Sequence, residues 1–282
     1  MKQILFRGAA TALVTPMQPD GSLDLETLSR LTEWQIQSSI SALVPCGTTG
    51  EAATLTDEER FTVIQTVAKT AAGRVPVIAG AGCNDTARAE QNCLAAAAAG
   101  ADALLLVTPY YNKCTPKGLQ SHFARLASAT PLPVILYNVP SRTGVTIDME
   151  SRRKLSKVDN IIGLKEASTD FSLIHQHLLE LGDTLPLYSG NDDQIVPILS
   201  LGGIGVISVL SNVAPTQTHE ICQKFFDGDV AGSRQMQLDA MDLCNALFCE
   251  VNPIPVKTAL NMMGMGAGAF RMPLCEMEEA NA

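Results

Sequence analysis

The sequence predicts an α/β protein, a (β/α)8 barrel of the TIM type followed by a C-terminal helical extension. Three observations carry this prediction: short apolar runs that recur along the chain, segments with helical spacing between them, and further helical stretches after the last run. Runs that are apolar on both faces are typical of parallel strands covered by helices. Eight such units match a closed barrel better than an open sheet, with a doubly wound sheet as the structural alternative.

The predicted strands are the short apolar runs, at residues 9–14, 42–45, 75–79, 103–107, 133–137, 161–164, 185–188 and 204–209. The first helix follows Asp20-Gly21 and places Leu25, Leu28 and Leu31 on one side. Later helices have start signals, a capping box at Thr56–Glu59 and a proline, Pro116, at a first helical position. The alanine-rich run before Gly100 predicts a closely packed helix.

The segment after Val213 contains three helical stretches, 213–227, 230–249 and 255–264, which is more than one closing helix requires. We therefore divide the chain into a barrel over residues 1–212 and a closing helix with extension over residues 213–282. No Pro/Gly/Ser-rich linker or charge block separates the two parts. The extension is expected to pack on the barrel.

Composition narrows the class of protein. The 282 residues carry a net charge of −9, which disfavours nucleic acid and anionic membranes as partners. No uninterrupted apolar stretch reaches the roughly 18 residues of a membrane span. The eight cysteines form no CxxC pair and the first 30 residues hold no signal-like core, so we expect reduced thiols in a cytoplasmic protein.

Lys165 is the most informative single residue. In a barrel the active site lies at the C-terminal ends of the strands, and Lys165 follows the apolar run 161–164 without a turn. Its amine should therefore face the barrel mouth, where desolvation lowers the pKa and leaves a neutral nucleophile able to form a Schiff base. Most lysines are solvated surface cations, and position is what separates Lys165 from them.

Three hydroxyl groups follow other strands. Tyr137 should lie one strand from Lys165, where a phenol could shuttle protons, although a half-buried strand tyrosine is an equally good interpretation of Tyr137 by itself. Thr48 and Tyr111 could extend a proton relay, because a hydroxyl both donates and accepts.

Two parts of the sequence could bind anionic groups of a substrate. The Gly47–Gly50 loop offers unhindered backbone amides for a small carboxylate, although a plain tight turn would need no ligand. Arg142 could bind a second carboxylate, although most loop arginines are only solvated. Other site types fit less well: the four histidines show no zinc spacing, and the glycine clusters lack nucleotide-binding patterns, so we expect neither a metal nor a cofactor.

Five motifs, in order, give the chain a resemblance to the dihydrodipicolinate synthase family, within the wider pyruvate-dependent class I aldolase and N-acetylneuraminate lyase superfamily. The resemblance runs from about Gly8 to Pro273. The motifs are Gly47–Glu51, Thr108–Asn112, Tyr137–Gly144, Gly163–Ala167 and Asn252–Lys257.

The resemblance implies a synthase that condenses pyruvate, as an imine on Lys165, with L-aspartate 4-semialdehyde to give 4-hydroxy-tetrahydrodipicolinate in diaminopimelate and lysine biosynthesis. Tyr137, Thr48 and Tyr111 would form the relay, and Arg142 would bind the semialdehyde carboxylate. Thr49 would hold the pyruvate carboxylate, and Gly190 and Ile207 would line the pyruvate pocket. No cofactor is implied.

The resemblance also implies a homotetramer built from two tight dimers, in which Tyr111 crosses the dimer interface. Lysine-inhibited members have a feedback site there, and the positions that match it in this sequence are Ala52, Asp57, Arg60, Asn84, Arg88 and Tyr110. Arg60 and Arg88 replace residues that are His or Glu in many sensitive members. Like charges about 4 Å apart cost roughly 1–4 kcal/mol, so we expect weak or absent inhibition by lysine. Family members commonly continue into a terminal helix beyond Pro273, where nine residues, 274–282, remain.

Two other functions stay open from the sequence. The first is a sister aldolase that acts on N-acetylneuraminate or a 2-keto-3-deoxy sugar acid with the same lysine chemistry. Arg142 and the pair Thr48-Thr49 favour the synthase, because the sister enzymes generally vary at these positions. The second is a barrel that only binds a keto acid, because fold alone does not establish function. No predicted catalytic residue is missing, which disfavours that interpretation.

Overall fold

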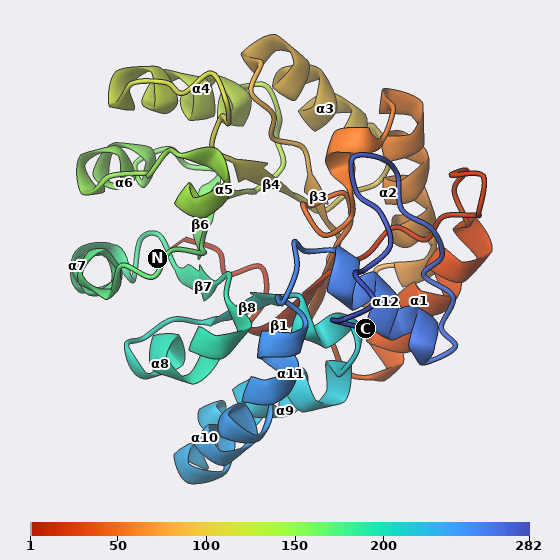
Figure 1. The fold of residues 1–282 in the computed structure, drawn as a ribbon. Helices are drawn as coiled ribbons and strands as arrows, with labels where there is room; N and C mark the ends of the chain where they lie inside the picture. Colours follow the sequence, from red (N-terminus) through yellow and green to blue (C-terminus); the bar gives the residue numbers. More distant parts are fainter. Residues whose placement is uncertain (1) are drawn as a thin grey trace.

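A closed ring of eight parallel strands, surrounded by helices, forms the body of the protein (Figure 1). The computed structural model describes residues 2–282. The strands pair in the order β2-β1-β8-β7-β6-β5-β4-β3, and a parallel bridge between Leu43 and Val77 joins the two ends of the sheet. The strands are β1 (Gly8–Ala12), β2 (Ala42–Val44), β3 (Ile78–Gly80), β4 (Ala103–Val107), β5 (Val134–Asn138), β6 (Ile161–Glu166), β7 (Leu187–Ser189) and β8 (Gly205–Ser208). The predicted barrel is confirmed, and the doubly wound sheet is wrong.

Two strand bounds differ from the prediction for reasons that the backbone makes clear. The third strand begins at Ile78 instead of residue 75, because Pro76 has no N–H to give to a ladder; its carbonyl accepts a bond of 3.0 Å from the Leu43 N–H. The first strand ends at Ala12, and the Val14 N–H instead donates to Oδ1 of Asn212, at 3.2 Å.

Side chains alternate between two apolar layers along each strand. Val44, Ile135 and Ile207 belong to the cluster that fills the barrel. Their neighbours Leu43 and Leu136 belong to the larger cluster between the strands and the surrounding helices. The strands are therefore buried on both faces, as parallel barrel strands must be.

The helices of the barrel lie outside the ring of strands. They are α1 (Leu25–Gln37), α2 (Asp57–Ala71), α3 (Thr86–Ala98), α4 (Pro116–Ser128), α5 (Pro140–Thr143), α6 (Met149–Leu155), α7 (Phe171–Leu181) and α8 (Ile195–Ser200). The capping box of α2, the N1 proline of α4 and the left-handed Gly100 after α3 are confirmed. Within residues 2–282, no helix has both the length and the apolar character that a membrane crossing requires.

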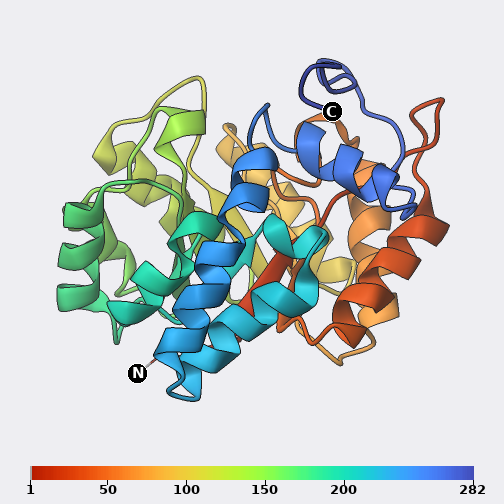
Figure 2. The same ribbon diagram turned by 60° about the horizontal axis from the view of Figure 1, so that its bottom comes forward.

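The C-terminal helices are α9 (Pro215–Phe226), α10 (Val230–Asp239), α11 (Met241–Ala246) and α12 (Ile254–Met262). Figure 2 shows them along one side of the barrel, with α12 near the end at which the C-terminus lies. Val256 and Leu260 of α12 share an apolar cluster with Val14 and Leu31 of the barrel. The predicted helical stretch over residues 230–249 is confirmed from Val230 to Ala246, as two helices that meet at Ala240, which keeps a right-handed helical backbone.

Candidate active site

Lys165 lies near the C-terminal end of β6, and its side chain points into the mouth of the barrel. Strand pairing places it directly beside Tyr137 of β5, which confirms the predicted neighbourhood. Lys165 is only 5% exposed, and its Nζ lies 4.3 Å from the centroid of the Tyr137 ring. A buried amine and a phenol therefore share one wall of the barrel mouth.

The surroundings of Lys165 favour its neutral form. Burial lowers the pKa of Lys165 to about 8, with Asp192 acting to raise the pKa and Arg142 to lower it further. Lys165 takes part in none of the nine ion pairs found among residues 2–282. A useful fraction of the amine is therefore unprotonated and nucleophilic near neutral pH.

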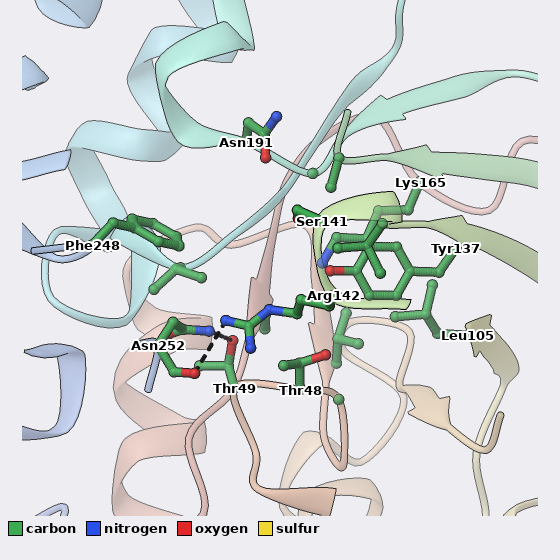
Figure 3. Close-up of a pocket in the computed structure, with 17 residues that line it drawn as sticks. Thr48, Thr49, Leu105, Tyr137, Ser141, Arg142, Lys165, Asn191, Phe248 and Asn252 are labelled. Carbon is green, nitrogen blue, oxygen red and sulfur yellow. Dashed lines mark hydrogen bonds between the residues drawn. The ribbon is translucent and has the colours of Figure 1, made fainter. Parts of the chain in front are cut away.

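Lys165 and Tyr137 face a cavity of about 220 Å³ (Figure 3). Six of the predicted catalytic and substrate-binding residues line it: Thr48, Thr49, Tyr137, Arg142, Lys165 and Gly190. They come from the ends of four strands, β2, β5, β6 and β7, or the loops that follow them. Within the described part of the chain, His, Cys, Asp and Glu form no group of three that could hold a metal ion.

Tyr137 remains a proton donor at neutral pH. Burial raises the pKa of its phenol, while Arg142 and a hydrogen bond with Thr48 act in the opposite direction. The phenol, the Thr48 hydroxyl and the Lys165 amine thus lie around one small volume. The arrangement can move protons to and from a group held at Lys165.

Gly190 packs closely against the residues around Lys165. A Cβ at this position would lie 2.7 Å from Cβ of Ala167 and 3.1 Å from Cε of Lys165. A larger residue would therefore require Ala167 or the Lys165 side chain to shift. This is a physical reason for a glycine in the wall of the cavity.

The loop after β2 and the C-terminal segment meet at the anion-binding side of the cavity. Asn252 donates from Nδ2 to Oγ1 of Thr49 at 3.0 Å, and its carbonyl accepts a bond of 3.2 Å from Nη2 of Arg142 (Figure 3). Phe248 also lines the cavity. Neither Phe248 nor Asn252 was predicted from the sequence as a pocket residue, although Asn252 begins one of the five motifs.

Two predicted residues lie elsewhere. Ile207 is fully buried in the packed interior of the barrel, and Val209, two residues further on, lines the cavity in its place. Tyr111 is 92% exposed and has a left-handed backbone, with φ of 71°. It is not among the residues that line the cavity of its own chain.

Two buried ion pairs lie next to residues that line the cavity. Glu166, the neighbour of Lys165, is bonded by Arg152 at 2.5 Å and by Nδ2 of Asn138 at 2.8 Å. Glu51, at the end of the Gly47–Gly50 loop, accepts a bond of 2.7 Å from Nζ of Lys257 in α12. The loop is therefore tied to the C-terminal helices through both Asn252 and Lys257.

The six candidate feedback positions lie in one region beside α2. Arg60 is buried and donates to the carbonyls of Gly80 and Ala52, at 3.2 and 2.9 Å. Arg88 is exposed and pairs with Asp57 at 3.1 Å. Both guanidinium groups act on the pKa of Tyr110, and the carbonyl of Asn84 accepts a bond from Asn112. Both guanidinium groups thus lie close enough to Tyr110 to act on the pKa of its phenol, which they lower.

Comparison with known proteins identifies the family. The model of the dihydrodipicolinate synthetase family matches residues 5–282. The chain belongs to this family. A relative from Clostridium perfringens named 4-hydroxy-tetrahydrodipicolinate synthase is 49% identical over 98% of this chain and 95% of its own length. A relative of the same name from Lachnoclostridium phytofermentans is 50% identical over 99% and 95%. The crystal structure of dihydrodipicolinate synthase from Thermotoga maritima superposes with a TM-score of 0.96 at 40% identity, covering 99% of this chain and 95% of that one.

Proposed function

We infer that this protein is an enzyme, a 4-hydroxy-tetrahydrodipicolinate synthase that condenses pyruvate with L-aspartate 4-semialdehyde in diaminopimelate and lysine biosynthesis. The observation that carries this inference is the buried Lys165 amine, with a pKa of about 8, facing a small cavity that also holds Tyr137 and Arg142. Membership of the dihydrodipicolinate synthetase family and the named relatives at about half identity support the same reaction.

The first step joins pyruvate to Lys165. The neutral amine attacks the ketone carbon, and loss of water gives an imine. Tyr137 and Thr48 pass protons to the departing oxygen and take them from nitrogen. The protonated imine then accepts the electron pair of a methyl C–H bond, whose proton passes to the Tyr137 and Thr48 relay, and an enamine forms; the imine is the electron sink, so no further cofactor is needed.

The pyruvate carboxylate is held by the Gly47–Gly50 loop. Its backbone amides and Thr49 provide donors, and Asn252 fixes the Thr49 hydroxyl.

Arg142 takes the carboxylate of the semialdehyde. It lines the cavity and donates one hydrogen bond, to the Asn252 carbonyl, which leaves further N–H groups of the guanidinium for a ligand. The enamine carbon attacks the aldehyde held in this way, and cyclisation through the substrate amine releases the heterocycle from Lys165.

Borohydride trapping tests the imine. Pyruvate and borohydride should add a stable mass to Lys165 in the wild type and in Arg142→Ala, and none in Lys165→Ala. Arg142→Ala should instead lose use of the semialdehyde. Equal loss of trapping in both variants contradicts these roles, and cleavage of N-acetylneuraminate in place of condensation favours the sister aldolase.

We propose that the protein assembles as a homotetramer of two tight dimers, with Tyr111 entering the partner's cavity to complete the relay. The support is the exposed ring and constrained backbone of Tyr111, which does not reach its own cavity. Mixing Tyr111→Phe with Lys165→Ala tests this, because a mixed dimer regains one intact site. Absence of regained activity in a verified mixed dimer contradicts the proposal.

We propose that lysine inhibits the enzyme weakly or not at all. Arg60 and Arg88 bring two cations to the feedback positions, although Asp57 partly offsets the charge of Arg88. Half-maximal inhibition by sub-millimolar lysine contradicts this proposal.

We propose a cytoplasmic location. All eight cysteines are free thiols in the structure, which suits a reducing compartment. Fractionation of cells that express the protein tests this.

A further inference from the structure

The Gly47–Gly50 loop lies between two residues with an unusual backbone. Cys46, just before the loop, has φ of 56°, and Glu51, just after it, has φ of 54°. Both values fall in the left-handed region, which residues other than glycine seldom occupy. Such a conformation persists only where the surrounding structure holds it. The shape of the loop therefore depends on what holds its two ends.

The backbone N–H groups of this loop are the donors that have to be kept in place. Among residues 2–282, no backbone carbonyl accepts a hydrogen bond from the N–H groups of residues 47–50. Gly47, Thr48 and Thr49 line the cavity beside Lys165. Successive N–H groups in a turn form a concave site for an anion. They can act together on one carboxylate only while the loop keeps its shape.

Backbone packing holds the beginning of the loop. The carbonyl of Pro45 accepts a bond of 2.9 Å from the Gly80 N–H. A Cβ at Gly80 would lie 2.0 Å from the carbonyl oxygen of Cys46, so β3 lies directly against this residue. The first left-handed residue is therefore fixed within the barrel itself.

One ammonium group holds the end of the loop. Nζ of Lys257 in α12 donates to Oε1 of Glu51 at 2.7 Å and to the carbonyl of Thr15 at 3.1 Å. The Thr15 hydroxyl in turn donates to the carbonyl of Gly50 at 2.7 Å. The side chains of Lys257 and Glu51 are fully buried, which strengthens the bond between them. A single residue of the C-terminal helices thus holds Glu51 directly and Gly50 through Thr15.

We propose that Lys257 is a positioning residue for the keto acid, and that it holds Glu51 and Thr15 so that the loop amides stay arranged for the carboxylate. This inference rests on the proposed function, in which pyruvate binds beside Lys165. Lys257 is not among the residues that line the cavity, so its effect passes through the loop. Selection for a ketone with a carboxylate over a neutral ketone should therefore depend on Lys257.

The test compares pyruvate with hydroxyacetone, a three-carbon ketone in which a neutral alcohol replaces the carboxylate. Each ketone can form an imine with Lys165, and cyanoborohydride reduces the imine to a stable adduct. The measured quantity is the ratio of trapping efficiencies, pyruvate over hydroxyacetone, from the dependence of each rate on ketone concentration. A general loss of folded protein lowers both efficiencies and leaves this ratio unchanged.

Three single variants separate the anchor from the strain of the left-handed backbone. Glu51→Gly removes the carboxylate and also relieves the strain. Glu51→Gln removes the charge but keeps an oxygen that can accept from Lys257. Ala72→Gly is the matched control, because Ala72 is exposed and has φ of 49° at the C-terminal end of α2.

We expect Glu51→Gly to lower the ratio by about tenfold, because amides that are no longer held must be ordered when the carboxylate binds. Glu51→Gln should stay within about threefold of the wild-type ratio, because it keeps the hydrogen bond. Ala72→Gly should leave the ratio unchanged. The proposal is overturned by an unchanged ratio in Glu51→Gly, or by a ratio in Glu51→Gln as low as that in Glu51→Gly.

The double variant Lys257→Met, Glu51→Gln tests Lys257 without leaving a buried charge unpaired. Its circular dichroism spectrum should match that of the wild type, while its ratio should fall as far as that of Glu51→Gly. A folded double variant with the wild-type ratio overturns the role of Lys257. Failure of the wild type to trap pyruvate refutes the proposed function itself, whereas normal trapping with unchanged ratios in the variants refutes only the positioning role.

Discussion

The protein buries two lysines, and they behave in opposite ways. Lys165 is 5% exposed and has no ionic partner, whereas Lys257 is fully buried and is bonded to Glu51 and to the carbonyls of Thr15 and Ala269. Burial lowers the pKa of both. Only at Lys257 do all three N–H donors have acceptors, which favours the ammonium form, and an ammonium has no lone pair with which to attack a carbonyl. Burial therefore lowers the pKa of a lysine, but the amine can act as a nucleophile only where no ionic partner holds it.

The largest expected effect is that of Lys165→Met. We expect kcat to fall by on the order of 10⁴-fold or more, because no other amine in the cavity can form the imine. The free energy of unfolding should be unchanged or higher, because a buried amine without an ionic partner is removed. Activity and urea denaturation measure the two effects, and Lys154→Met, at an exposed lysine, is the control. Substantial residual activity would contradict the assignment of Lys165, and not Lys257, as the lysine that forms the imine.

Lys257→Met should lower the free energy of unfolding, in contrast to Lys165→Met. Removing one partner of a buried pair costs about 3–5 kcal/mol, because the Glu51 carboxylate is left without compensation. The double variant Lys257→Met, Glu51→Gln should recover much of this loss in the free energy of unfolding. If the single and double variants are equally unstable, the charge on Glu51 is not the cause.

A smaller effect is expected from pH. The neutral fraction of Lys165 reaches one half at about pH 8, so the rate of borohydride trapping should rise about tenfold from pH 7 to pH 9. The pKa is lower in the folded state than the ordinary value of 10.5. Between these values the unfolded chain binds more protons, so this group makes the free energy of unfolding rise with pH. A trapping rate that does not vary over this range contradicts the assignment.

The smallest effect should follow from breaking an exposed pair. Arg153 and Glu180 lie 2.6 Å apart, with side chains 44% and 32% exposed. Arg153→Ala should change the free energy of unfolding by less than about 1 kcal/mol, since water screens such pairs. Urea denaturation beside Lys257→Met measures the contrast. A loss as large as that of the buried pair would mean that burial is not what separates them.

Features that are marked by a local pattern of residues could be predicted from the sequence. Strand periodicity, capping boxes and the position of Lys165 after its apolar run predicted the barrel and the neighbourhood of Tyr137. Contacts between distant segments had no such signal. Nothing local marks Asn252 as the partner of Thr49, or Lys257 as the partner of Glu51, because these contacts depend on how the C-terminal helices pack. The resemblance alone placed Ile207 at the pyruvate pocket; its side chain is buried in the barrel interior, and Val209, two residues further on, lines the cavity.

The ion pair between Glu51 and Lys257 joins residues 206 positions apart in the chain. During synthesis, every barrel strand leaves the ribosome before Lys257 does. The loop that receives the keto acid therefore gains its anchor only after all eight strands have been synthesised. A chain that has already formed Lys165 and its strands still lacks the contact that holds this loop, so the reactive amine is in place before the binding site beside it is fixed.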